Sequence, residues 1–417
     1  MSAPADLEPV EAFRARARAW LADHMPRIEG QLPDRLADGR REVERELQRR
    51  LWDGGFAGIC WPAEYGGLGL TLEHQRAFTE ESLPYDMPFS LNVPTFGILA
   101  ATLIDFGTHE QKARHLPAIL KGEELWVQFL SEPSGGSDLA GVLTRADRDG
   151  DVFVLNGSKI WSSGAAESDY AMCLARTNWD VPKHRGLTMF IVKIHQPGIQ
   201  VEQIRQVDGS MEFCQEFFDD VPIPASDVVG EVDDGWTVAT RLLVHERNAV
   251  GGGSPYTSGR SAGHESSGQD VGLAEMARVA GRVGDPVARQ LVAEAHIRGL
   301  VGGQLVKRIT QGVTLGKMAP PAGSLLKLFS ATSVMRRYEI GLELAGEAGV
   351  TWPADTETPG RRLGELTLWR QGLSLGGGSN EIQRNIISER LLGMPRELAA
   401  DRDVPYREVR RSGSRGD

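Results

Sequence analysis

Glu246 combines a reactive side chain with an unusual position. It lies in Gly-Trp-Thr-Val-Ala-Thr-Arg-Leu-Leu-Val-His-Glu-Arg-Asn-Ala-Val-Gly (235–251), where apolar residues recur at helical spacing on both sides of it. This spacing predicts a carboxylate on the apolar face of its own helix. Such a carboxylate is either paired, or it has the raised pKa that a general base needs near neutral pH. Helix geometry alone favours the pair, since ion-pair networks are a common environment of buried acids.

Two loops rich in small and hydroxyl residues have the composition of ligand-binding segments. The first, 126–141, holds Ser131 and Ser137 between a short strand and a turn, so it offers hydroxyl and backbone N–H donors. The second, 159–165, places Trp161 beside two serines, which would let an indole stack on a ring while hydroxyls bond its edge. For the first loop, an ordinary turn stays open as the alternative. For the second, the alternative is a core tryptophan before a loop.

A third, glycine-rich segment precedes a helix near the end of the chain. Leu-Gly-Gly-Gly-Ser-Asn-Glu-Ile-Gln-Arg-Asn (375–385) predicts a helix that starts near Ser379 or Asn380, with Asn380 and Gln383 as a capping box. Glycines before a helix N-terminus are typical of an anion site. The segment lacks the Gly-Lys-Ser/Thr of a P-loop and the spacing of a dinucleotide fingerprint. Residues 343–349, Glu-Leu-Ala-Gly-Glu-Ala-Gly, form a second glycine-marked helix end.

Composition narrows the class of protein. The 417 residues are enough for two or three domains, with 41% hydrophobic and 25% charged residues, the balance of a globular protein. A net charge of −11 without a sustained basic run in the body of the chain argues against nucleic-acid binding. Three widely spaced cysteines fit a reducing compartment, and no apolar stretch approaches the length of a membrane span. We therefore expect a cytoplasmic protein.

Patterning divides the chain into three regions and a tail. Residues 1–125 carry helical stripes, and residues 235–398 are helical again. Between them, residues 126–234 carry short apolar runs and turn signals such as Asp149-Gly150 and Asn156-Gly157, typical of an antiparallel barrel or sandwich. A Gly/Ser-rich segment, 251–268, is typical of a flexible surface loop. Residues 399–417 are expected to be a disordered tail.

Four motifs, in this order, resemble the acyl-CoA dehydrogenase family through nearly the whole chain. They are Leu-Ser-Glu-Pro-Ser-Gly-Gly-Ser-Asp (130–138), Gly-Ser-Lys-Ile-Trp-Ser-Ser (157–163), Phe-Phe-Asp-Asp-Val-Pro-Ile-Pro (217–224) and Asn-Glu-Ile-Gln-Arg-Asn-Ile-Ile-Ser-Glu-Arg-Leu-Leu-Gly (380–393). The resemblance implies an α+β multidomain fold, with an N-terminal α-helical domain, a middle antiparallel β-barrel domain and a C-terminal four-helix-bundle domain. It also implies FAD, bound between the last two domains and across a subunit interface.

The same resemblance implies which residues contact the cofactor and the substrate. The family's usual Arg-x-x-Phe-Gly segment, which reaches a neighbour's cofactor phosphates, is replaced by Gly-Arg-Val-Gly-Asp-Pro (281–286), so Arg282 is its candidate substitute. FAD contacts are thus expected at Gln128, Phe129, Leu130, Ser131, Ser137, Trp161, Ser162, Ser163, Arg282, Gly346, Ser379 and Glu381. Substrate contacts are expected at Ser137 and Arg247, although Arg247 points elsewhere on its helix and favours a local charge role.

In the family reaction, a carboxylate removes the α-proton of an acyl-CoA while the β-hydride passes to flavin N5. The base is commonly a Glu just before the Gly-Thr/Ser of the last motif, and that position is Gly377 here, which has no side chain. Other members carry the Glu on the first long helix of the C-terminal domain, the position that Glu246 matches. The resemblance therefore implies Glu246 as the base, with the Gly377 backbone N–H as an oxyanion donor to the thioester.

We thus expect an FAD-dependent acyl-CoA dehydrogenase of fatty acid or other lipid degradation, which forms a 2-enoyl-CoA and reduces an electron-transfer flavoprotein. A homodimer, a homotetramer or a hetero-oligomer with a related subunit is expected. Two alternatives stay open, namely a flavin oxidase or monooxygenase of the same fold, and a scaffold subunit of a mixed dehydrogenase complex. The sequence leaves the acyl group open as straight, branched or steroid-derived.

Overall fold

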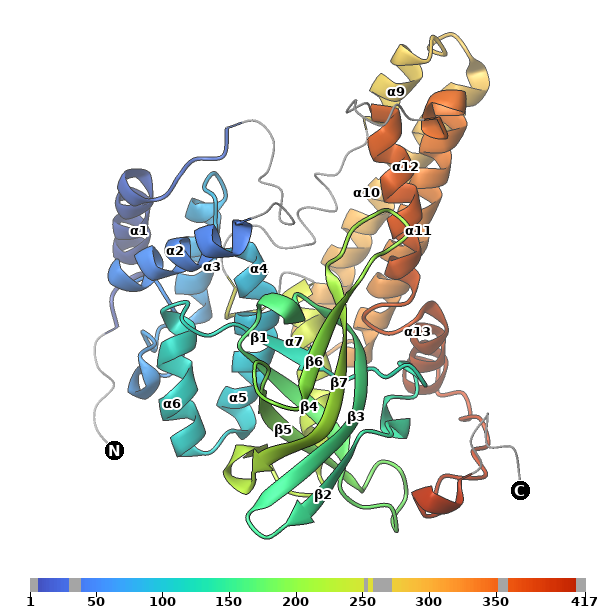
Figure 1. Ribbon diagram of the computed structural model, residues 1–417. Helices are drawn as coiled ribbons and strands as arrows, with labels where there is room; N and C mark the ends of the chain where they lie inside the picture. Colours follow the sequence, from blue (N-terminus) through green and yellow to red (C-terminus); the bar gives the residue numbers. More distant parts are fainter. Residues whose placement is uncertain (1–6, 30–38, 251–253, 258–271, 352–358, 410–417) are drawn as a thin grey trace. The chain divides into compact units, whose positions relative to one another are not determined.

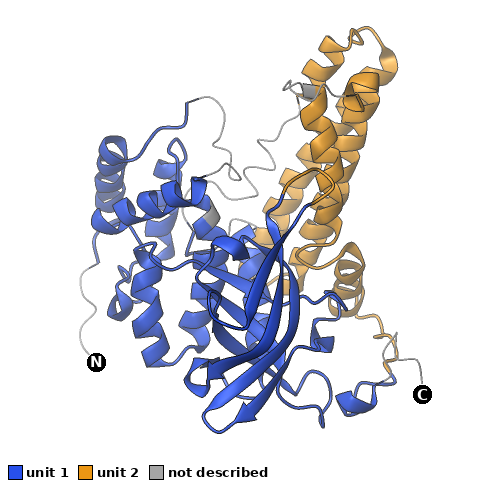
Figure 2. Cartoon of the chain, in the orientation of Figure 1, with its two compact units in different colours: residues 1–205, 211–267, 400–417 blue, residues 206–210, 268–399 orange. Residues whose placement is uncertain are grey.

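The structure, a computed structural model, describes residues 7–29, 39–250, 254–257, 272–351 and 359–409. The chain divides into two compact units (Figure 2). Unit 1 comprises residues 1–205, 211–267 and 400–417, and unit 2 comprises residues 206–210 and 268–399. Most of the expected flexible loop at 251–268 lies outside the described residues.

Helices form the N-terminal part of unit 1 (Figure 1). They are α1 (Val10–His24), α2 (Arg40–Asp53), α3 (Leu72–Ser82), α4 (Phe89–Leu91), the π-helical η2 (Asn92–Ala100), α5 (Ala101–Phe106) and α6 (His109–Leu120). On α1, the side chains of Phe13, Ala17 and Leu21 repeat at helical spacing and are fully buried. At the start of α6, Thr108 and Gln111 form a capping box. Periodicity therefore accounts for the packing of α1, and a capping box for the start of α6.

One sheet follows the helices in unit 1. Its strands are β1 (Trp126–Phe129), β2 (Arg145–Asp149), β3 (Val152–Ser163), β4 (Tyr170–Arg176), β5 (Leu187–Lys193), β6 (Ile199–Ile204), β7 (Phe213–Pro224) and β8 (Val228–Val229). Their order is β6-β7-β3-β2-β4-β5-β8, with β1 beside β4. The pairs are antiparallel as expected, except that β1 and β2 each meet β4 in parallel. The loop and hairpin between β1 and β4 supply the long crossover that parallel neighbours need.

One predicted turn is instead an irregularity inside a strand. Asp149-Gly150 does lie at the β2–β3 hairpin, where Asp149 pairs with Val152. Asn156-Gly157, by contrast, lies within β3, where the register against β7 shifts. Gly157 has a φ of 143°, and a Cβ at this position would lie 2.7 Å from Thr144 Cα. The glycine therefore permits a close approach of β3 to Thr144 and does not reverse the chain.

Helix α7 (Gly235–Val250) carries Glu246 and is fixed within unit 1. Its apolar face packs mainly against η2 and β5 through Val238, Ala239, Leu242 and Ala249. Asp105 of α5 accepts hydrogen bonds from Arg241 at 2.6 Å and from His245 Nε2 at 2.9 Å. Burial would raise the pKa of the Asp105 carboxyl, but the bonds from Arg241 and His245 hold it below its ordinary value. These contacts fix the rotation of α7 about its axis.

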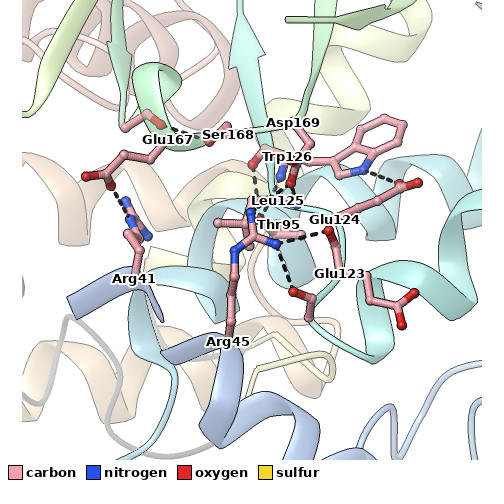
Figure 3. A network of polar contacts seen from close by, with 12 residues as sticks. Arg41, Arg45, Thr95, Glu123, Glu124, Leu125, Trp126, Glu167, Ser168 and Asp169 are labelled. Atoms are coloured by element: carbon pink, nitrogen blue, oxygen red, sulfur yellow. Dashed lines mark hydrogen bonds and ion pairs between the residues drawn. The ribbon is translucent and has the colours of Figure 1, made fainter. Parts of the chain in front are cut away.

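A polar network joins the helices to the first strand of the sheet (Figure 3). Arg45 of α2 donates to Asp169 Oδ2 at 2.9 Å and to carbonyls of the turn before β1. Asp169 also accepts a bond from Leu125 N at 2.8 Å. Thr95 Oγ1 of η2 bonds the backbone N and O of Trp126, at 3.0 and 3.2 Å. The start of β1 is therefore set by α2 and η2.

A buried ion pair joins the segment after β1 to β3. Lys159 Nζ lies 2.9 Å from Glu132 Oε1 and donates to Leu130 O at 3.0 Å. Glu132 also accepts bonds from the backbone N of Leu143, at 2.6 Å, and of Thr144, at 2.9 Å. Burial would raise the pKa of the Glu132 carboxyl, yet the Lys159 charge and these bonds hold it below its ordinary value. The loop 132–144 is thereby closed at its base and attached to β3.

A second buried carboxyl lies on the neighbouring strand. Glu216 of β7 is the register partner of Lys159 on β3. Its Oε2 accepts a bond from Ser162 Oγ at 3.0 Å. Burial raises the pKa of the Glu216 carboxyl to about 7, against the opposing effects of Ser162 and the Lys159 charge. Glu216 therefore titrates inside the sheet near neutral pH.

Unit 2 is built on helices, as its periodicity predicts. They are α9 (Leu273–Val279), α10 (Pro286–Thr314), α11 (Gly323–Ala345), α12 (Pro359–Trp369), α13 (Asn380–Ile386) and the π-helical η9 (Ile387–Leu391). Asp285 caps α10, and Pro286 occupies the first position of that helix. Helices α10, α12 and α13 all pack on α11 (Figure 1). No helix in the described part of the chain is long and apolar enough to cross a membrane.

The chain beyond unit 2 departs from the expected disordered tail. Residues 400–409 belong to unit 1, and Tyr406 is only 4% exposed. Tyr406 N donates to Val181 O at 2.9 Å, and Arg407 N donates to Trp179 O at 3.0 Å. Burial of the Tyr406 ring and these hydrogen bonds offset the entropy lost when residues 400–409 are ordered. The composition of the segment alone does not reveal these contacts. Residues 410–417 lie outside the described part of the chain.

The buried ion pair predicts a large loss of stability in either single variant. Lys159→Met or Glu132→Gln leaves one buried partner uncompensated, so each is expected to lower the free energy of unfolding by about 3–5 kcal/mol. Chemical denaturation of both variants and of the double variant measures the loss and the coupling. Arg145→Met, whose ion pair with Asp147 is exposed, is the control and should change stability by less than about 1 kcal/mol. Equal, small effects of all the single variants would contradict the prediction.

Glu216 predicts a pH dependence of stability. Its folded-state pKa of about 7 lies above the ordinary value of 4.5, so its stabilising protonation is complete below pH 4.5 and is lost as pH rises through 7. The thermal midpoint of the wild type should therefore gain from acidification between these pH values, and Glu216→Gln should remove that part of the gain. Glu202→Gln, which changes an exposed carboxyl on β6, should leave it intact. An identical pH profile for Glu216→Gln and the wild type would show that Glu216 titrates normally.

Candidate active site

Glu246 and Gln128 meet within unit 1. Gln128 Nε2, on β1, donates to Glu246 Oε2, on α7, at 2.9 Å. Glu246 is partly exposed, whereas Leu242 and Ala249 on the same helical face are buried. Gln128 Oε1 is buried and accepts no hydrogen bond from the described residues. A buried acceptor without a donor is costly, so its position is suited to a polar group of a ligand or to water.

Trp161 lies on a bulge of β3. The register against β7 shifts between Ile160 and Ser162, and Trp161 has a φ of 68°. This left-handed conformation is an outlier for a bulky residue and is typical of functional sites that the surroundings hold in place. The indole is 54% exposed and meets the Phe213 ring edge-on, with centroids 5.8 Å apart. The bulge thus turns an aromatic face outwards, where it can stack on a planar ring.

The serines of the two predicted ligand-binding loops differ in what they can reach. Ser163 and Ser137 are exposed, and Ser131 is half-buried. Ser162 is buried, and its hydroxyl is already engaged by Glu216. The backbone also links these positions, since Ile160 N donates to Ser131 O at 3.0 Å. The exposed serines can therefore bond a ligand, whereas Ser162 fixes the strand beneath the bulge.

The remaining predicted site residues of unit 1 differ in their exposure to solvent. Phe129 and Leu130 are buried, so their side chains belong to the core and only their backbone can face a ligand. Arg247 is exposed on α7. Of the predicted residues in this unit, the structure brings together Gln128 with Glu246, and Ser131 with the strand that carries Trp161.

In unit 2, the glycine-rich segment is shaped by Gln383. Gln383 is buried, and its amide donates to Gly377 O and Gly378 O, each at 3.2 Å. Gly377 and Gly378 have φ values of 66° and 85°, a conformation that favours glycine. The predicted Asn380–Gln383 capping box is wrong, because Ser379 caps α13 by accepting from Ile382 N at 3.3 Å. Gln383 instead reaches past the cap to the glycine carbonyls.

Arg282, Gly346 and Glu381 are further predicted FAD contacts, and two of them are engaged in contacts within unit 2. Arg282 bonds Asp285 Oδ2 at 2.6 Å and the carbonyl of Glu343 at 2.5 Å, which links the start of α10 to the end of α11. Gly346 is exposed directly after α11, with a φ of 55°. Glu381 is exposed and pairs with Arg384 at 3.2 Å. The structure thus brings Arg282 to the segment that ends at Gly346.

Sequence reasoning missed the charged residues that support the site. Glu132, Lys159 and Glu216 are all buried near β3, and none was singled out from the sequence. A signal was present, because Lys159 occupies an inward position of β3, and a lysine at such a position requires a partner. No group of metal-ligating side chains occurs among the described residues. The arrangement in unit 1 therefore offers a carboxylate, an exposed indole and hydroxyl donors on a fixed sheet.

Family models match nearly the whole chain in three consecutive parts. The acyl-CoA dehydrogenase N-terminal domain matches residues 8–123, the middle domain matches 128–221, and the C-terminal domain matches 233–392. These parts agree with the order of helices, sheet and helices in the structure.

Relatives and solved structures agree with the models. The chain is 38% identical over 402 residues to the acyl-CoA dehydrogenase IpdE1 of Mycobacterium tuberculosis, covering 94% of this chain and 99% of that protein. It is similar to the Tcur3481-Tcur3483 steroid ACAD, with 29% identity, a TM-score of 0.72 and coverage of 94% and 99%. It is also similar to the ChsE4-ChsE5 complex from Mycobacterium tuberculosis, with 27% identity, a TM-score of 0.69 and coverage of 95% and 100%. The chain belongs to the acyl-CoA dehydrogenase family, whose members are flavoprotein oxidoreductases acting on CH–CH groups.

Proposed function

We propose that this protein is an FAD-dependent acyl-CoA dehydrogenase that converts an acyl-CoA to the 2-enoyl-CoA, with Glu246 as the base that removes the α-proton. The contact between Glu246 and Gln128 carries the proposal, because it places a carboxylate at the end of the strand that leads into the cofactor motif. The glycine at position 377 supports it, since the other family position for the base has no side chain.

The chain's own groups suit proton removal. The Gln128 amide orients one carboxylate oxygen of Glu246, and a base must be oriented towards the proton that it removes. Asp105 fixes the rotation of α7 through Arg241 and His245, so Glu246 keeps its direction. In the proposal, the Gly377 N–H donates to the thioester oxygen as negative charge develops there.

The residues around Trp161 fit an isoalloxazine ring. An exposed indole on a strained bulge offers a stacking face, and Ser131 and Ser163 offer donors for the polar edge of the ring. The unpartnered Gln128 oxygen gives the site a further buried acceptor. When bound, FAD supplies the acceptor for the β-hydride of the substrate. On the ADP side, the proposal assigns Arg282, Gly346, Ser379 and Glu381.

For the substrate, we propose a thioester with a bulky, steroid-derived acyl group, and for the assembly, a hetero-oligomer with a related subunit. The names of two similar structures, a steroid ACAD and a two-component complex, support both proposals. Exposed apolar side chains along α10, such as Val287, Ile297 and Leu300, support a further subunit contact. An electron-transfer flavoprotein is the proposed acceptor.

Flavin reduction by a panel of acyl-CoAs tests this function. The purified protein should be yellow, and anaerobic mixing with straight, branched and steroid-derived acyl-CoAs should bleach the flavin absorption, fastest with a steroid-derived thioester. Subsequent exposure to oxygen should restore the colour slowly. A colourless protein would instead support a scaffold subunit, and rapid reoxidation with release of peroxide would support an oxidase.

A further inference from the structure

The segment 400–409, here called the C-terminal strap, lies against the segment 179–181 and the turn 139–141 of unit 1. Its backbone bonds the segment 179–181 through Tyr406 N and Arg407 N. The Tyr406 ring stacks on Trp179, with centroids 5.7 Å apart and an interplanar angle of 24°. The strap is therefore attached to unit 1 by backbone pairing and by one buried aromatic ring.

Tyr406 and Arg176 together bind three consecutive carbonyls of one turn. Tyr406 Oη donates to Gly141 O at 2.5 Å. Arg176, which is fully buried on β4, donates to Ala140 O at 2.6 Å and to Val142 O at 3.2 Å. The Arg176 guanidinium in turn lies 3.8 Å from the centroid of the Tyr406 ring. Because buried carbonyls need donors, these two side chains set the position of the turn.

The turn 139–141 lies within the loop 132–144, which also carries Ser137. At the base of the loop, Glu132 binds the backbone N of Leu143 and Thr144. Away from this base, the turn 139–141 directly follows the exposed residues Ser137 and Asp138. Lys183 Nζ, 2.9 Å from Asp138 Oδ1, is a weaker and more exposed third contact. The exposed crown of the loop, 133–138, thus lies between two anchors, and Tyr406 belongs to the second.

We propose that Tyr406 is a positioning residue for acyl-CoA binding. Through the Gly141 carbonyl and through Arg176, it fixes the crown that presents Ser137, without touching the substrate itself. The proposal rests on the proposed function and on the substrate contact that the family resemblance implies for Ser137. Without this anchor, the crown must become ordered when the acyl-CoA binds. The conformational entropy lost in that step weakens the affinity for the acyl-CoA. The effect therefore falls on KM more than on kcat.

Two variants separate the hydroxyl of Tyr406 from its ring. Tyr406→Ala removes both contacts and should raise KM for the acyl-CoA by roughly tenfold, with kcat within about twofold of the wild type. Tyr406→Phe keeps the ring on Arg176 and loses one hydrogen bond, so a rise in KM of about threefold to fivefold is expected. The matched control, Arg407→Ala, changes the next strap residue, whose side chain pairs with Asp180, and should behave as the wild type.

Hydrogen exchange supplies a readout that needs no substrate. In the purified protein without substrate, amides of residues 134–142 should exchange about tenfold faster in Tyr406→Ala than in the wild type and in Arg407→Ala. If Tyr406→Ala melts below the assay temperature, Tyr406→Phe carries the same comparison. Unchanged KM, or unchanged exchange of this peptide, in a folded variant would overturn the positioning role. A wild type that turns over no acyl-CoA would instead contradict the proposed function, which is a separate outcome.

Discussion

The carboxylate of Glu132 is the constraint on which the candidate site depends. It is buried, it pairs with Lys159 of β3, and it accepts the backbone N–H groups of Leu143 and Thr144. One group thereby closes the serine-rich loop and joins it to the strand that carries Trp161. A buried charge of this kind is tolerated only when its bonds are complete, so the loop cannot shift without a large cost. The pair therefore gives the site its geometry more than it adds net stability.

The elements around this pair are fixed by similar means. Ser162 and Glu216 bond beneath the bulge, so the strained backbone at Trp161 is supported from below. Asp105 fixes α7, and the Gln128 amide meets the Glu246 carboxylate from β1. Binding and catalysis need such pre-organisation, because each mobile group would have to be ordered when the ligand binds. The buried polar contacts of unit 1 thus hold in place the residues to which we assign the proposed chemistry.

The sequence was a good guide where one physical term dominates. Helical spacing placed α10 and α11, and short apolar runs between turn signals placed β4 to β7, because burial of apolar side chains decides both. It failed where tertiary contacts override a local signal. Asn156-Gly157 has the composition of a turn but serves a close approach to Thr144, and the 400–409 segment has a tail-like composition but buries Tyr406. The capping box failed because Gln383 finds the glycine carbonyls.

The candidate site shows the same division. Motif order indicated the family, which the family models and relatives confirm. The roles of Gln128, Trp161 and Glu246 at the site stay proposals. The contacts that orient those residues join segments far apart in the sequence, such as Glu132 with Lys159 and Tyr406 with Gly141. No local sequence pattern predicts such pairs, although an inward-facing lysine on a strand, such as Lys159, indicates that a partner exists.

The rate of flavin reduction in Glu246→Gln tests the central claim most directly. The variant keeps the size and hydrogen-bonding capacity of the side chain but removes the base, so it should retain FAD and acyl-CoA binding. Stopped-flow reduction by an acyl-CoA should fall by roughly 10²- to 10⁴-fold. Asn248→Ala, an exposed change on the same helix, should reduce at the wild-type rate. Near-normal reduction in Glu246→Gln would contradict the account and place the base elsewhere.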